Sequence, residues 1–109
     1  MLSQKQIIVK IDIQNRLNEC DQSIEENIQR KLRLALTKIA AYISSITFII
    51  SDVIGLNGKT ETHCSLTLSL YQMPNVVIDE THADLYFVID RVIQKATRTV
   101  FRNFNRKRD

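Results

Sequence analysis

The sequence has 109 residues, of which 44% are hydrophobic and 25% charged, with only two Gly and one Pro. This composition excludes a disordered or low-complexity chain, and the length suits a single domain built from regular elements. The net charge of +3 is unevenly distributed: residues 1–84 carry 8 basic and 10 acidic side chains, whereas residues 85–109 carry 7 basic and 2 acidic ones. Such a basic C-terminal quarter indicates a polyanionic partner.

The first half of the chain predicts a strand, a helix and a second strand. Apolar residues at every second position over 7–13 predict a half-buried strand. Ser23 and Glu26 have the S-x-x-E spacing of a capping box, which predicts a helix from about residue 23 to residue 43 with one apolar stripe. The apolar and β-branched run at 46–50 predicts the second strand.

The second half predicts two further strands and a helix. Residues 55–58 have the Gly and Asn content of a turn. Apolar and polar side chains alternate over 62–70, which predicts a third strand with one buried face. The segment 73–75 ends that strand, and residues 76–78 predict a short fourth strand. From about residue 84 to residue 106 the apolar period is helical again.

The predicted order β-α-β-β-β-α indicates one α+β domain over residues 1–109. Each helix has a single apolar stripe, so both helices must pack on the one apolar face of a four-stranded sheet, in two layers. The opposite sheet face, which carries polar side chains such as Lys10, His63 and Thr67, should meet water or a partner.

The last helix carries the clearest functional signal. At about 100° per residue, five basic side chains fall within a sector roughly 80° wide: Arg91, Lys95, Arg98, Arg102 and Arg106. Like charges at this spacing destabilise a helix, and only Asp90 and Asp109 are near enough in sequence to relieve the repulsion. This uncompensated charge favours a phosphate backbone as partner, and the alternative is an ordinary solvated face.

The first helix adds four basic side chains outside its apolar stripe: Arg30, Lys31, Arg33 and Lys38. These alone make an ordinary solvated face. If the two helices lie side by side, Lys31 and Lys38, which flank the stripe, join the cations of the last helix in one surface. Phe87 and Phe101 lie off the apolar stripe of the last helix, where they either pack at the rim or stack on unpaired bases.

Several classes of site find no support in the sequence. It has no P-loop, GxGxxG or GxSxG motif, and Asp79 and Glu80 point to opposite faces of a strand, so we expect neither enzymatic activity nor a cofactor. Cys20 and Cys64 are isolated, which predicts no disulfide framework or zinc site and suits core thiols in a reducing cytosol. No apolar run is long enough for a signal peptide or a membrane span. We therefore expect a cytoplasmic protein without a metal, a small-molecule substrate or a membrane partner.

Four parts of the sequence follow a known pattern: SDVIG at 51–55, Cys64, the run 74–86, and IDR at 89–91. The most specific part is ADLY at 83–86 followed by IDR, which together open a basic helix after a strand that begins with two valines. In these residues and in its element order, the chain resembles the ribosome hibernation promoting factor family, also called ribosome-associated inhibitors or the sigma-54 modulation protein family.

The resemblance implies a hibernation factor that docks in the mRNA and tRNA channel of the small ribosomal subunit and inhibits translation under stress or in stationary phase. It implies rRNA contacts at the positions where the family keeps basic residues: Lys31, Lys95, Arg98, Arg102 and Arg106. Such side chains suit a phosphate backbone better than the reading of bases. The resemblance also implies the short form, which lacks the domain that pairs two ribosomes in long forms, and we expect a monomer when it is free.

The sequence departs from the family pattern in three places. The loop 54–62 lacks the Pro, one of the Gly residues and the basic residue of the family's loop pattern. On the first helix Leu34 stands where the family has a basic residue, and after ADLY the residues Phe87 and Val88 replace two alanines. Two other functions remain open at this point. One is a general double-stranded-RNA-binding regulatory module, and the other is a protein-interaction domain that docks its basic helix on an acidic partner.

Overall fold

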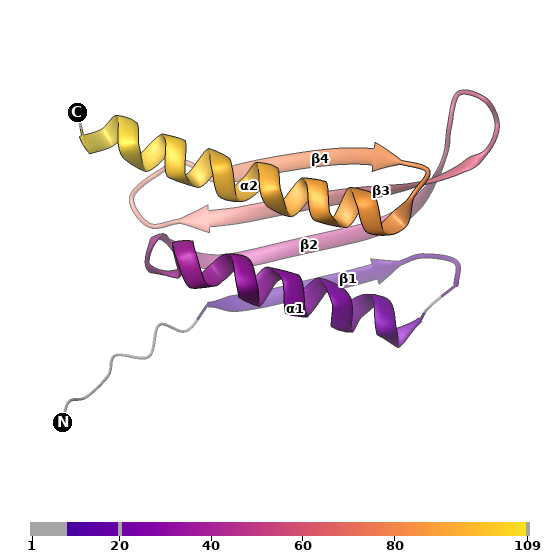
Figure 1. Cartoon of the computed structure of the whole chain (residues 1–109), viewed down its shortest axis with the longest axis horizontal. Helices are drawn as coiled ribbons and strands as arrows, with labels where there is room; N and C mark the ends of the chain where they lie inside the picture. Colours follow the sequence, from indigo (N-terminus) through magenta and orange to yellow (C-terminus); the bar gives the residue numbers. More distant parts are fainter. Residues whose placement is uncertain (1–8, 20, 109) are drawn as a thin grey trace.

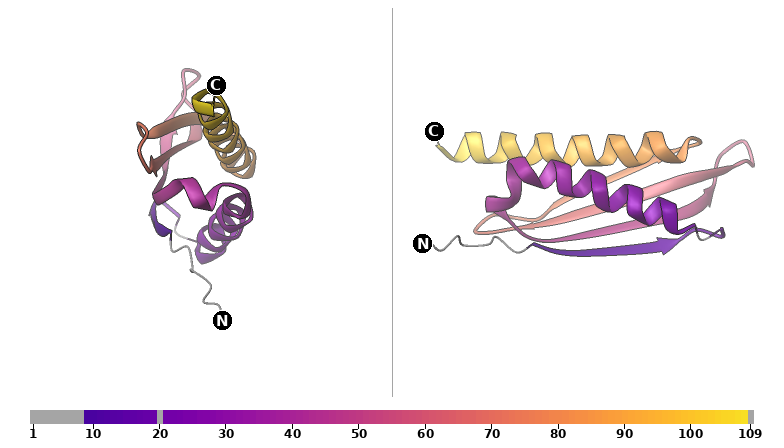
Figure 2. Two further views of the ribbon diagram at one scale, coloured as in Figure 1. Left: turned by 90° about the vertical axis from the view of Figure 1, so that its left-hand side faces the viewer. Right: turned by 60° about the horizontal axis from the view of Figure 1, so that its bottom comes forward.

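The computed structural model describes residues 9–19 and 21–108, with 106–108 described by their backbone alone. It contains four strands and two long helices, the first of which continues into a short 3₁₀ turn: β1 (Lys10–Arg16), α1 (Gln22–Ile39), η1 (Ala40–Tyr42), β2 (Ile43–Ile54), β3 (Thr60–Leu70), β4 (Val76–His82) and α2 (Leu85–Arg108). Both helices lie on the same face of the sheet (Figures 1 and 2). The predicted α+β fold with two layers is confirmed.

The four strands lie in the sheet in their order along the chain. β1 and β2 are parallel, so between them the chain must return to the end of the sheet at which β1 begins. α1 makes this crossover connection. The β2–β3 and β3–β4 pairs are antiparallel and are joined by short loops. In the β2–β3 loop Gly58 has φ +80°, a left-handed conformation that glycine adopts without a steric penalty.

The core lies between the helices and the inner face of the sheet. Along β2 the side chains of Ile46, Phe48 and Ile50 are buried, and the residues between them are partly exposed on the outer face. From the helix side, Ile28 and Val92 are completely buried against this surface. The alternation predicted from the sequence therefore sets which face receives the helices.

The start of α1 differs from the prediction. Asp21, and not Ser23, is the N-cap, and its Oδ1 accepts a hydrogen bond of 2.9 Å from the backbone N–H of Ser23. That hydrogen bond lowers the pKa of the Asp21 carboxyl. The helix therefore begins at Gln22, two residues earlier than an N-cap at Ser23 would place it.

The other boundaries differ at the ends of elements. α1 ends at Ile39 and not near residue 43, because Ile43 is already in β2 and pairs with Leu70. β1 extends from Lys10 to Arg16 along β2, so it begins and ends later than the predicted 7–13, of which 7 and 8 lie outside the described residues. β2 and β4 are longer than predicted, since residues 43–45 and 51–54 of β2 and residues 79–82 of β4 continue the ladder with β3.

Candidate nucleic-acid interface

The helix layer, formed by α1 and α2, is the surface on which the predicted basic residues lie. The two helices begin at the same end of the sheet and run side by side (Figures 1 and 2). Among the described residues, an ion pair joins Lys31 Nζ of α1 to Asp90 Oδ1 of α2, and the ring of Tyr42 in η1 stacks on that of Phe104, with centroids 4.0 Å apart. The first contact lies midway along α1, and the second lies just beyond its end, in η1.

Lys31 was predicted as a phosphate contact, and the structure places it in the seam between the helices. Its ammonium group pairs with Asp90, and its side chain is only about a quarter exposed. Asp90 was noted in the sequence as a neighbour of the cations on its own helix, whereas its partner is on α1. The Lys31 charge is therefore partly neutralised within the protein.

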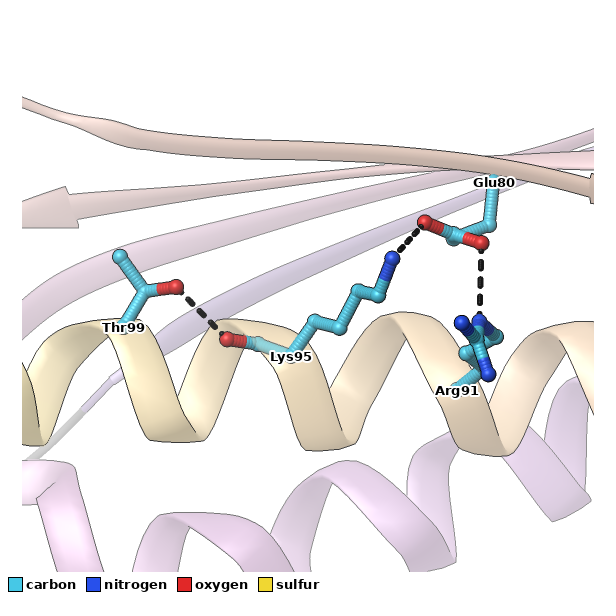
Figure 3. Close-up of polar contacts among 4 residues, drawn as sticks. All are labelled: Glu80, Arg91, Lys95 and Thr99. Carbon is cyan, nitrogen blue, oxygen red and sulfur yellow. Dashed lines mark hydrogen bonds and ion pairs between the residues drawn. The ribbon is translucent and has the colours of Figure 1, made fainter.

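Lys95 and Arg91 lie over the edge strand β4 and share the carboxylate of Glu80 (Figure 3). Glu80 Oε2 accepts a hydrogen bond of 2.5 Å from Lys95 Nζ, and Oε1 accepts one of 3.1 Å from Arg91 Nε. The bond from Lys95, followed by that from Arg91, lowers the pKa of Glu80 from its ordinary 4.5. We call these three residues the Glu80 cluster.

The Glu80 cluster corrects the argument that the cations of the last helix lack acidic compensation. Glu80 is 15 residues before Lys95 and belongs to a strand, so helical periodicity alone could not pair them. The sequence did show that Asp79 and Glu80 point to opposite faces. Glu80 faces α2, and Asp79 lies with His63, whose Nε2 is 3.2 Å from Asp79 Oδ1.

Arg98 and Arg102 complete the predicted stripe on α2, and both are exposed. In the described ranges neither forms an ion pair, in contrast to Lys95, about one turn before Arg98, and Arg91, about two turns before it. Arg106 lies within α2, but its side chain is outside the described part of the chain. Arg98 and Arg102 therefore present full charges to solvent or to a ligand.

On α1, three further cations are exposed: Arg30, Arg33 and Lys38. None of them forms an ion pair with any residue that the structure describes. The helix layer thus combines paired cations near the start of α2 with unpaired cations on α1 and further along α2. A surface of this kind attracts a polyanion over a wide area without any requirement for base sequence.

The comparison with protein families agrees with the sequence resemblance. Residues 11–108 match the family described as sigma 54 modulation protein / S30EA ribosomal protein. The chain belongs to this family. In a search of curated proteins, none matches the sequence.

Solved structures share the fold of this S30EA family member. A ribosomal subunit interface protein from Coxiella burnetii superposes with a TM-score of 0.68 at 16% identity, over 86% of this chain and 98% of that one. The N-terminal domain of Protein Y from Thermus thermophilus superposes with a TM-score of 0.62 at 19% identity, over 84% of this chain and 97% of that one. At these identities the likeness establishes the fold.

The motif that carried the family resemblance has a structural explanation at the start of α2. Asp84 of the ADLY run accepts hydrogen bonds at Oδ1 from the backbone N–H groups of Tyr86 (3.0 Å) and Phe87 (3.2 Å). Its own N–H donates to His82 Nδ1 at 2.9 Å. The motif thus ends β4 and starts the basic helix at a defined residue.

Two other candidate groups of this family member, the ring of Phe87 and the thiol of Cys64, have other surroundings. Phe87, 43% exposed, has its ring 4.4 Å from that of His82, and the Arg91 guanidinium lies 5.8 Å from the Phe87 centroid. Cys64 is completely buried, and burial raises the pKa of its thiol to about 12, whereas Cys20 lies outside the described residues.

Neither a metal cluster nor a membrane-spanning helix is found among the described residues. No group of three or more His, Cys, Asp or Glu among them could hold a metal ion. Within the same ranges, no helix is long and apolar enough to span a bilayer.

Proposed function

We propose that this protein is a ribosome hibernation factor that binds the small ribosomal subunit in the mRNA and tRNA channel. In this proposal it acts in the cytoplasm and inhibits translation under stress or in stationary phase. Membership of the S30EA family supports a ribosomal partner, as does the fold shared with a ribosomal subunit interface protein. The function needs no catalysis, because a protein that occupies the channel excludes mRNA and tRNA by its volume.

The observation that carries the proposal is the unpaired charge of the helix layer. Arg98 and Arg102 on α2, and Lys38 on α1, are exposed and have no carboxylate partner within the described ranges. These cations are the proposed contacts to rRNA phosphates, together with Arg106. Lys31 and Lys95 are also proposed as contacts, but each is already paired with a carboxylate, that of Asp90 and that of Glu80. To bind a phosphate, each lysine would have to leave its carboxylate or contact both groups, so we expect them to contribute less to the affinity for rRNA.

Sedimentation of purified small subunits with the protein tests the proposal. We expect Arg98→Glu with Arg102→Glu to abolish co-sedimentation and inhibition of cell-free translation while the melting temperature stays unchanged. The matched control is Lys10→Glu with Lys59→Glu, which makes the same change in net charge at exposed residues outside the helix layer. If the control loses binding as completely as the helix variant, net charge alone is responsible and the helix layer is not the interface.

Salt dependence separates the proposal from the two other functions. Binding to rRNA should weaken steeply with salt, since each phosphate contact contributes roughly −0.7 to −0.9 to the slope of log K against log salt. A flat dependence would favour an acidic protein partner that is held by few charges. Equal affinity for a free RNA duplex and for the small subunit would favour a general double-stranded-RNA-binding module.

A further inference from the structure

An apolar groove lies between α1 and α2, in the part of the helix layer where the cations are unpaired. Its volume is about 640 Å³, and Leu34, Ala35, Ile93 and Phe101 supply most of its apolar lining. Ile93 is 7% exposed, whereas Leu34 is 65% and Phe101 39% exposed. The groove therefore has a buried floor and two apolar walls that remain open to solvent.

Both helices place a cation beside this groove. Lys38 lines it from α1 and Arg98 lines it from α2, and Gln94 adds a side-chain amide. None of the nine described residues that line the groove is acidic. An apolar floor with cations on both sides is complementary to a ligand that has a flat apolar body and negative charges attached to it.

An ion pair and a ring stack flank the groove at its two ends. Its α1 residues, 34–38, lie between Lys31 and Tyr42, and its α2 residues, 93–101, lie between Asp90 and Phe104. The ion pair and the ring stack thus lie on either side of the groove. A ligand would find the site already formed and would not have to separate the helices, which lowers the cost of binding.

We propose that this groove holds an unstacked nucleobase of the RNA that the helix layer binds. The ring of Phe101 would stack on the base, Gln94 would hydrogen-bond its edge, and Lys38 and Arg98 would contact the flanking phosphates. Single-stranded RNA segments are recognised by this combination of aromatic stacking, edge hydrogen bonds and charge. The inference rests on the proposed function, since it assigns to one part of that interface the recognition of a base.

Chemical probing of base edges on the small subunit tests the inference. With wild-type protein bound, at least one unpaired base should become protected, and the Phe101→Ala variant should lose that protection. Stacking on an aromatic side chain typically contributes enough to change affinity by roughly five- to a hundred-fold, and the partial exposure of Phe101 places our expectation near five- to ten-fold. The salt slope should not change, because no cation is removed.

Phe87→Ala is the matched control, since Phe87 is on the same helix and has similar exposure but contacts His82 and Arg91 outside the groove. It should bind the subunit within about two-fold of wild type and protect the same base. Phe101→Tyr, which keeps an aromatic ring, should restore protection. The melting temperatures of the variants exclude unfolding as the cause.

Three outcomes would overturn the inference. If Phe101→Ala binds as tightly as wild type while the Arg98 and Arg102 double variant does not bind, the groove is empty and the proposed function stands. If Phe101→Ala weakens binding but the pattern of protected bases is unchanged, the groove holds a protein segment. If wild-type protein does not bind small subunits at all, the proposed function fails and the inference fails with it.

Discussion

The carboxylate of Glu80 is the group whose removal tests the electrostatics of the helix layer most directly. It accepts hydrogen bonds from Lys95 and Arg91 (Figure 3) and is only 20% exposed. Glu80→Gln removes the charge and keeps the size of the side chain. Because an exposed ion pair contributes about 0–1 kcal/mol and Glu80 serves two cations, we expect the free energy of unfolding at pH 7 to fall by about 1 kcal/mol.

The pH dependence of this difference follows from the direction of the pKa change. The hydrogen bond from Lys95, then that from Arg91, lowers the pKa of Glu80 in the folded protein from its ordinary 4.5. A carboxyl of this kind stabilises the fold fully at pH values above its unfolded pKa, and the stabilisation is lost as the pH falls through the folded pKa. The difference between wild type and Glu80→Gln should therefore be full at pH 7 and shrink below pH 4.5.

Urea denaturation followed by circular dichroism, at pH 7 and at several pH values below 4.5, measures the effect. Glu61→Gln is the control, since Glu61 is on the neighbouring strand β3 and forms no ion pair within the described residues. A Glu80→Gln protein as stable as the Glu61→Gln control at pH 7 would refute the role of the Glu80 cluster. So would a difference that persists unchanged in acid.

Three further predictions concern the start of α2, the ion pair between the helices and the burial of the core. Asp84→Ala removes the acceptor at the start of α2 and should cost about 1 kcal/mol, seen as a fall in melting temperature of roughly 4–8 °C. A double-mutant cycle of Lys31→Ala and Asp90→Ala should give a coupling of about 0.2–1 kcal/mol at low salt, and a coupling of zero would contradict the ion pair. In a Cys20→Ser variant, the Cys64 thiol should not react with a disulfide reagent at pH 8 until the protein unfolds, because burial raises its pKa to about 12. Rapid reaction of the folded protein would contradict that burial.

The fold could be predicted because local periodicity determines it. The alternation of β3 from Thr62 to Leu70 and the stripes of both helices indicate which side chains are buried, and one apolar face per element leaves few ways to assemble them. The ends of elements were less predictable. Asp21 and Ser23 are both good N-cap residues two positions apart, and Ile43 continues the helical period although it pairs with Leu70 in the sheet.

The candidate site was predictable in its location and not in its electrostatics. Helical spacing placed Arg98 and Arg102 on one exposed face, and the structure agrees with that placement. The same spacing said nothing about Glu80, because the pairing of a strand carboxylate with a helix depends on how β4 and α2 pack. The groove was also hidden in the sequence, since Leu34 and Phe101 come together only when the two helices lie side by side.

Along α2 the cations divide into two groups. Near the start of α2 they are used inside the protein, in the Glu80 cluster and in the ion pair of Lys31. Further along, Lys38, Arg98 and Arg102 have no such partner in the described ranges, and the groove lies beside two of them. Lys38 lies in the last turn of α1, where the helix dipole favours a cation, and this interaction leaves its charge available to a ligand. We therefore expect RNA to engage the C-terminal halves of both helices, with the paired cations holding the helices in position for it.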